Sequence, residues 1–159
     1  MNIPKNEGLY LAILIILCGG TLLAACNPRE FPGVKSLVIE NEKRSTKNTE
    51  QAIKESVELQ DLEGVCREVP IPRDFTFVWR ATDRNKQSLL SSYYHSDTPY
   101  GEARRIWVDY FAANNWELKV SDASYPQKIR ANRGTYEVVI SHGGMGERTN
   151  YAIDCKKLK

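Results

Sequence analysis

The alternation of apolar and polar residues from position 75 onward predicts a series of β-strands. After Asp74, apolar residues recur at every second position up to residue 82, with Val78 as an exception. A period of two is typical of a strand that buries one face. The same pattern predicts strands over residues 75–82, 87–95, 116–121, 127–133, 136–140 and 150–156.

A helical period interrupts the strands between residues 99 and 113. Apolar residues recur there at spacings of three and four, at Ala103, Ile106, Trp107, Tyr110 and Phe111. This spacing places them on one helix face, which is expected to be core. Asp97 or Thr98 is expected to cap the helix, with Pro99 in its first turn. Asn114-Asn115 is expected to end it, because asparagine tolerates a left-handed C-terminal position.

The connections between the predicted strands determine the fold class. Strands joined by turns too short for a crossover run antiparallel, and the order of elements is β-β-α-β-β-β-β. We therefore predict an α+β domain, with an antiparallel sheet of about five or six strands and one long helix packed on one face. Five aromatic residues are expected to meet between the layers: Trp79, Trp107, Tyr110, Phe111 and Trp116.

The segment before this domain is predominantly polar. It begins NPREFPG and continues through ENEKRSTKNTEQ, which has no apolar residue to bury. This composition predicts a flexible tether over residues 26–64. Ala52, Ile53 and Val57 fall near helical spacing, so a short helix ended by Gly64 is expected within it. The small α+β domain then occupies residues 65–159.

An apolar run precedes the tether. It extends from Leu9 to Cys26, LYLAILIILCGGTLLAAC, and stops at Leu23-Ala24-Ala25-Cys26. These four residues resemble the lipobox of bacterial lipoproteins, in which a branched aliphatic residue and small residues precede a cysteine. The resemblance implies that residues 1–25 are a signal peptide and that Cys26 becomes a lipidated N-terminus. It implies a membrane anchor without implying an activity.

An uncleaved membrane anchor is the alternative interpretation of the run. Its 17 residues from Leu9 to Ala25 lie at the bottom of the roughly 17–25 that span a bilayer, and Gly19-Gly20 interrupts them. Cleavage is therefore favoured, and both interpretations place the rest of the chain outside the cytoplasm. In enteric-type bacteria, an aspartate directly after the lipidated cysteine resembles an inner-membrane retention signal. This chain has Asn27 at that position. The expected address is therefore the periplasmic side of the outer membrane if the host is diderm.

The four cysteines separate by position. Cys18 follows the bulky Leu17 inside the apolar run and does not fit a cleavage site. Cys26 is the predicted lipidation site. Cys66 and Cys155 remain as a pair in an oxidising compartment, where a disulfide is expected. A zinc site is the weaker alternative, because structural zinc normally takes four cysteine or histidine ligands.

The charge distribution gives little information about ligands. The formal net charge of the 159-residue chain is +2, too small to indicate nucleic acid, so we predict no nucleic-acid partner. Five arginines interleaved with tyrosines are candidates for a glycan or lipid-headgroup surface only if the fold brings them together: Arg104, Arg105, Arg130, Arg133 and Arg148.

Two histidine-centred hypotheses for chemistry were weighed against ordinary structural roles. His95 lies near Ser91, Ser92, Asp97 and Asp109, which together contain the groups of a hydrolytic triad, but the segment has no G-x-S-x-G signature. A polar strand end is the favoured interpretation of His95.

His142 and Met145 are residue types that bind copper, yet two ligands do not make a site. The glycines between and beside them, Gly143, Gly144 and Gly146, suit a hairpin loop. We predict no cofactor and no metal.

These observations together predict a non-enzymatic, membrane-anchored lipoprotein of the cell envelope that binds a protein partner or joins an assembly. A glycan, peptidoglycan or small-ligand binding module is the alternative, and a small hydrolase is the third hypothesis. The segment from Tyr110 to Leu118 resembles uncharacterised bacterial lipoprotein domains, and this resemblance transfers no function.

Overall fold

The computed structural model describes residues 32–83, 88–121, 126–143 and 148–158. The chain forms two compact units, residues 1–41 and 42–159. Helix α2 (Pro32–Glu55) begins in the first unit, where Leu37 and Val38 are exposed. Every other described element belongs to the second unit. The predicted signal peptide and Cys26 lie outside the described residues.

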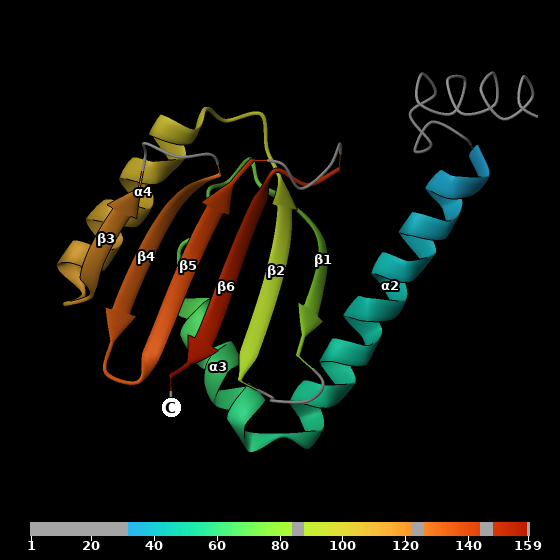
Figure 1. Cartoon of the computed structure of the whole chain (residues 1–159), viewed down its shortest axis with the longest axis horizontal. Coiled ribbons are helices and arrows are strands. Elements are labelled where there is room, and N and C mark those ends of the chain that lie inside the picture. Colours follow the sequence, from blue (N-terminus) through green and yellow to red (C-terminus); the bar gives the residue numbers. More distant parts are fainter. Residues whose placement is uncertain (1–31, 84–87, 122–125, 144–147, 159) are drawn as a thin grey trace, which may run out of the picture. The chain divides into compact units, whose positions relative to one another are not determined.

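The second unit contains a six-stranded antiparallel sheet, as the sequence predicted. In chain order the strands are β1 (Thr76–Thr82), β2 (Leu89–His95), β3 (Glu117–Ser121), β4 (Gln127–Arg133), β5 (Tyr136–His142) and β6 (Tyr151–Lys157). Their order across the sheet is β1-β2-β6-β5-β4-β3, so β6 lies between the two halves (Figure 1). Gly134, with φ +60°, makes the tight β4–β5 turn that the sequence predicted.

Two helices cover one face of this sheet, where the predicted fold has one. Helix α3 (Val57–Glu68) packs on β2 and β6, and α4 (Tyr100–Ala113) packs on β3 and β4 (Figure 1). The core between the layers contains Trp107 and Phe111 from α4, Leu59 and Leu62 from α3, and apolar residues of the strands. Fully burying each such side chain contributes about 1.5–3 kcal/mol.

The predicted aromatic core is correct for the helix and wrong at β1. Trp107, Phe111 and Trp116 are buried, with Tyr110 partly buried beside them. Trp79 lies on the other face of the sheet, where its ring stacks on Tyr93 at 3.9 Å. The cause is an irregularity in the β1–β2 register between Phe77 and Trp79, consistent with a bulge at Val78 that reverses the alternation.

The ends of α4 differ partly from the prediction. Pro99 is the N-cap residue, without a side-chain capping bond; Thr98 instead donates its hydroxyl to Asp74. At the other end Asn115 adopts φ +59°, the left-handed position expected of it. Ile106, expected in the core, is 42% exposed because it lies at the margin of the apolar face.

Helical structure occupies much of the segment predicted as a tether. Helix α2 continues to Glu55, and Ser56 caps α3 by accepting a hydrogen bond from the Leu59 amide. Gly64, expected to end a helix, lies inside α3. The helix stops instead at Val69, because the residue before Pro70 is restricted to extended backbone.

A disulfide joins Cys66 on α3 to Cys155 on β6, which confirms the predicted pair. Their Cα atoms are 6.0 Å apart, and the bond closes a loop across 89 residues. The bond therefore ties the helix layer to the middle of the sheet. Among the described residues, no helix has the length and apolar character needed to cross a membrane.

Candidate functional site

A small cavity opens on the helix-covered side of the sheet, and we call it the Arg80 pocket. Its volume is about 250 Å³. It lies between the C-terminal end of α3, the extended segment that follows it, and strands β1, β2 and β6. The lining residues are Cys66, Arg67, Val69, Ile71, Arg80, Ser92, Tyr94 and Ile153.

Two arginines and one glutamate determine the charge of the Arg80 pocket. The Nη1 of Arg80 and the Nη2 of Arg67 each lie 3.2 Å from the same oxygen, Oε1 of Glu63. One carboxylate therefore faces two guanidinium groups, which leaves one positive charge in excess. The Nε of Arg80 is buried and has no hydrogen-bond partner among the described residues, whereas nearly all buried polar groups in proteins have one.

A tyrosine–serine pair adds polar groups to one wall. Burial raises the pKa of Tyr94, while a hydrogen bond with Ser92 and the charge of Arg80 act in the opposite direction. The phenol therefore stays neutral at physiological pH and can donate or accept a hydrogen bond.

Apolar side chains lie exposed beside this wall. Ile71, which lines the pocket, is 39% exposed, and Phe77, whose ring packs edge-on against Tyr94 at 5.9 Å, is 47% exposed. Phe77 lies opposite Tyr94 in the β1–β2 register, and the irregularity follows it directly, between Phe77 and Trp79. Irregularities of this kind often redirect side chains near binding sites. The pocket thus combines a charged interior with an apolar surround.

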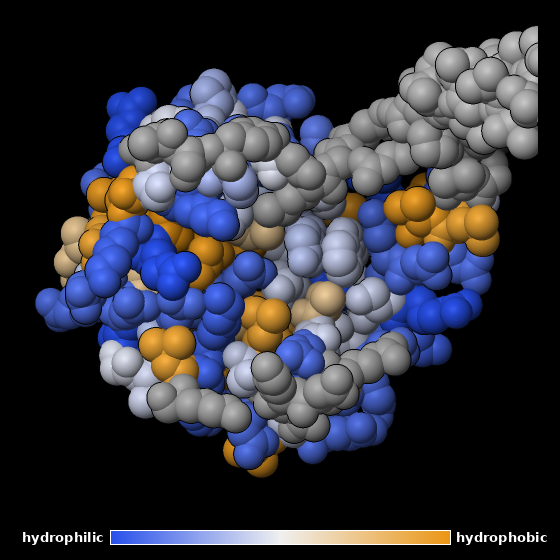
Figure 2. Space-filling view, viewed as in Figure 1, coloured by the Kyte–Doolittle hydropathy of each residue, from blue (hydrophilic) through white to orange (hydrophobic). Residues whose placement is uncertain are grey.

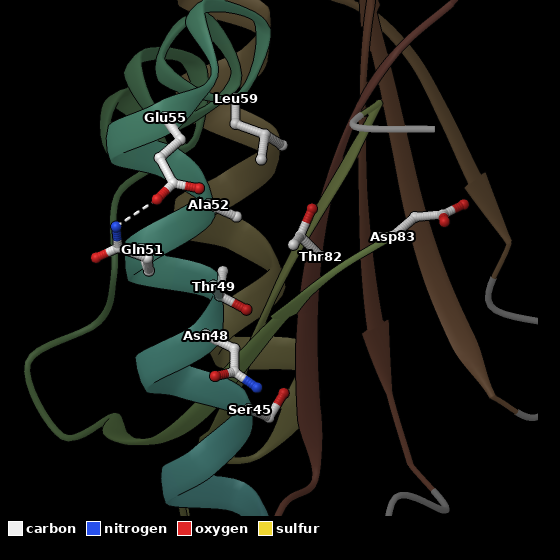
Figure 3. Close-up of a pocket in the computed structure, with 9 residues that line it drawn as sticks. All are labelled: Ser45, Asn48, Thr49, Gln51, Ala52, Glu55, Leu59, Thr82 and Asp83. Carbon is white, nitrogen blue, oxygen red and sulfur yellow. Dashed lines mark hydrogen bonds between the residues drawn. The ribbon is translucent and has the colours of Figure 1, made fainter. Parts of the chain in front are cut away.

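A second, larger cavity lies between α2 and the end of β1. Its volume is about 420 Å³, and Figure 3 shows its lining of short polar side chains around Ala52 and Leu59. The Gln51 amide donates to Glu55, about one helical turn further along the exposed surface of α2. Asp83 on the rim immediately precedes residues 84–87, which lie outside the described part. The charge convergence found at Arg80 is not seen in this lining.

The sheet face away from α3 and α4 carries a different set of side chains (Figure 2). Glu137 is buried and pairs with Arg130 at 2.8 Å and Lys156 at 3.1 Å. Burial raises the pKa of the neighbouring Asp154, against a hydrogen bond from Ser91 that lowers it. The stacked Trp79 and Tyr93 rings lie on this same face.

The groups of the predicted hydrolytic triad do not assemble. His95 Nε2 lies 3.6 Å from Asp97 Oδ1, beyond hydrogen-bond distance. Ser92 interacts with Tyr94 and Ser91 with Asp154. The strand geometry explains the result, because a rise of about 3.3 Å per residue separates His95 from either serine by roughly 10 Å or more.

The structure describes only His142 of the predicted His142–Met145 pair. His142 packs its ring between Tyr100 and Tyr151, while Met145 lies outside the described residues. Within the described ranges, no group of three or more His, Cys, Asp or Glu side chains is arranged to hold a metal ion.

The five candidate arginines do not converge either. Arg104 and Arg105 lie on α4. Arg130 pairs with Glu137, Arg133 with Glu68, and Arg148 with Glu42. The five therefore lie on a helix, a strand and a turn, and the last three bind separate carboxylates.

Sequence reasoning overlooked Arg80, Glu63 and Tyr94. Arg80 is an ordinary polar position in an alternating strand, and Glu63 fell in the expected tether. The one available signal was Arg80 within the sequence FVWRAT, a charged residue inside an otherwise apolar strand, which requires a partner if that side is buried. Comparison with protein-family models, with curated proteins and with solved structures found no match to this chain.

Proposed function

We propose that this chain is a lipid-anchored protein of the bacterial cell envelope, and that its folded unit has a non-enzymatic role in binding a partner through the Arg80 pocket. The buried, unpartnered Nε of Arg80 in a cavity with an apolar surround carries the binding proposal. Convergent polar groups in an apolar concavity are typical of binding sites.

Two observations support the proposed location in the cell envelope. Leu23-Ala24-Ala25-Cys26 has the lipobox pattern, and the Cys66–Cys155 disulfide suits an oxidising compartment. Cys26→Ser is expected to prevent lipidation, which releases the protein from the membrane or leaves it unprocessed. Fractionation and mass spectrometry test this, and a variant with the parent's size and membrane association would contradict the anchor.

The binding role is tested in intact cells with a photo-crosslinking residue at position 77. The expected result is a discrete protein adduct that disappears when Arg80→Gln is added. Position 57, where Val57 is 70% exposed at the start of α3, is the matched control and is expected to give no such adduct. Equal adducts from both positions, or an adduct that is independent of Arg80, would contradict a role for the pocket.

Glycan or peptidoglycan binding is the second candidate. The stacked Trp79 and Tyr93 rings on the second sheet face favour it, because sugar rings also pack on aromatic faces. Sedimentation with purified peptidoglycan tests it, and the expected result is binding that Trp79→Ala abolishes. Unchanged sedimentation of that variant would remove this candidate.

A further inference from the structure

The donor groups that remain unused in the Arg80 pocket indicate what it binds. Arg80 donates through Nη1 to Glu63, and the opposite edge of the guanidinium presents Nε–H and Nη2–H side by side. Among the described residues, Nε has no hydrogen-bond partner. The group that matches two parallel N–H donors is a carboxylate, which accepts both in a bidentate arrangement.

The charge of the pocket agrees with one carboxylate. Arg67 and Arg80 face the single carboxylate of Glu63, so one negative charge on a ligand restores balance. The Arg67 side chain is 76% exposed and its charge is therefore largely screened, while Arg80 is 18% exposed. Arg80 is consequently the main anchor for the anion.

The remaining walls limit the rest of the ligand. Val69, Ile71 and Ile153 are apolar, and the Tyr94 ring lies among them. A volume of about 250 Å³ lies below the roughly 300–1,000 Å³ of pockets for drug-sized ligands, so the part of the ligand inside it is small. This fits a carboxylate with a short branched aliphatic group.

We propose that the Arg80 pocket binds a carboxylate monoanion that carries a short branched apolar group; the proposal rests on the proposed function and specifies its ligand. The same chemistry occurs in a free branched-chain acid and at the carboxyl end of a peptide with an apolar last residue. Glu63 lowers the affinity because its negative charge partly neutralises the guanidinium of Arg80.

The first test is a titration of the isotope-labelled full chain in detergent, followed by NMR. The probes are 4-methylpentanoate, which represents a free acid, and N-acetyl-leucine, which represents a peptide end, each compared with its neutral amide. The acids are expected to shift the Arg80 Nε–H signal and the Ile71 amide. The amides are expected to bind about tenfold more weakly, since a tenfold change corresponds to about 1.4 kcal/mol. The tighter of the two acids identifies the source.

Two variants are expected to change the affinity in opposite directions. Arg80→Gln removes the anchor, so the preference for acid over amide is expected to disappear. Glu63→Gln removes the neighbouring negative charge, and the acids are expected to bind about threefold more tightly, an effect within the modest range measured for single ion pairs. Loss of folding cannot produce tighter binding. Arg130→Gln, which removes an ion-paired arginine from the opposite sheet face, is the matched control and is expected to change neither affinity.

The outcomes separate this proposal from the proposed function. Equal binding of acids and amides at the pocket would overturn the carboxylate proposal and leave a binding role intact. Weaker acid binding by Glu63→Gln would also overturn it. If no probe shifts the pocket signals up to roughly 10 mM, where even millimolar affinity is detectable, the ligand class is wrong. The adduct at position 77 then decides the proposed function independently.

Discussion

Arg80 contacts two helices, α2 through its backbone and α3 through its side chain. Its backbone amide donates to the Thr46 hydroxyl at 3.1 Å, and its carbonyl accepts from Ser45 at 3.0 Å. Its side chain reaches the other way to Glu63. Because both backbone groups are bonded to α2, the start of the side chain is held in place, and the guanidinium is positioned before any ligand arrives.

Trp107 makes the largest contribution expected of any single side chain in the core. It is fully buried and donates its indole N–H to the Pro70 carbonyl at 2.9 Å. Trp107→Ala is expected to lower the free energy of unfolding by about 3–5 kcal/mol. Urea unfolding followed by far-UV circular dichroism measures this, and an unchanged midpoint would contradict the packing described for α4.

His142 makes stability depend on pH. Burial lowers its pKa below the ordinary value of about 6.5, so the unfolded chain takes up a proton at this residue before the folded chain does. Stability is therefore expected to fall as the pH drops below about 6.5. His142→Phe keeps an aromatic ring against Tyr100 and Tyr151 and removes the titrating group. Urea midpoints between pH 7.5 and 5.5 test this, and parallel curves for the two proteins would contradict it.

The residue-scale predictions from sequence succeeded where alternation was regular. Ile129, Val138 and Ile140 are buried as their spacing implied. The prediction failed at Trp79, because an extra residue in a strand reverses every later side chain, and the apolar Val78 was taken as a single exception to the alternation. The Arg80 pocket was missed for a related reason: its charged groups come from an apparently regular strand and from a helix that the sequence predicted only as a short one within the tether.

At the scale of elements, α2 is the main difference from the sequence analysis. The pattern argument looks for apolar residues on one face of a helix, whereas the Glu42–Glu55 part of α2 contacts the edge strand β1 through hydroxyl groups. Ser45 and Thr46 pair with backbone atoms of Arg80, and Thr49 is buried beside them. These contacts satisfy part of the exposed edge of a sheet. The polar composition of this segment predicted a tether, whereas its hydroxyl groups make the contacts that hold α2 against β1.

The edge contact gives a test at this scale. Thr46→Val keeps the side-chain shape but removes the oxygen that accepts from the Arg80 amide. We expect a loss of about 0.5–1.5 kcal/mol and faster hydrogen exchange at the Arg80 amide. Thr76→Val, at an exposed position of the same strand, is the control and is expected to leave that exchange rate unchanged. Equal rates in all three proteins would show that α2 does not protect the edge.

At the scale of the whole molecule, the fold class could be predicted from the sequence because the connections between elements restrict how the strands can pair. Short turns required antiparallel pairing, and one long amphipathic helix required a sheet face to cover. The position of β6 between β2 and β5 could not be predicted, since turn lengths do not specify which non-consecutive strands pair. The second helix on the same face was predicted only as a short helix within the tether, without a place on the sheet.

The disulfide is expected to stabilise the second unit as a whole. Replacing both Cys66 and Cys155 by alanine reopens a loop of 89 residues, for which chain entropy suggests a loss of up to about 4–5 kcal/mol. Denaturant unfolding with and without reductant measures it. Reductant is expected to lower the midpoint of the parent and to have no effect on the double variant. Equal midpoints for the parent in both conditions would contradict a stabilising bond.

The central position of β6 also determines when the sheet can close. This strand follows the other five in chain order, yet it alone joins the β1–β2 hairpin to the β3–β4–β5 meander. Until residues 151–157 are available, the two halves have nothing to pair with, and Cys66 has no partner. A chain that is threaded through a translocation channel from its N-terminus therefore stays open until residues 151–157 have passed. If the protein is exported as proposed, its topology supplies the delay in folding that export requires.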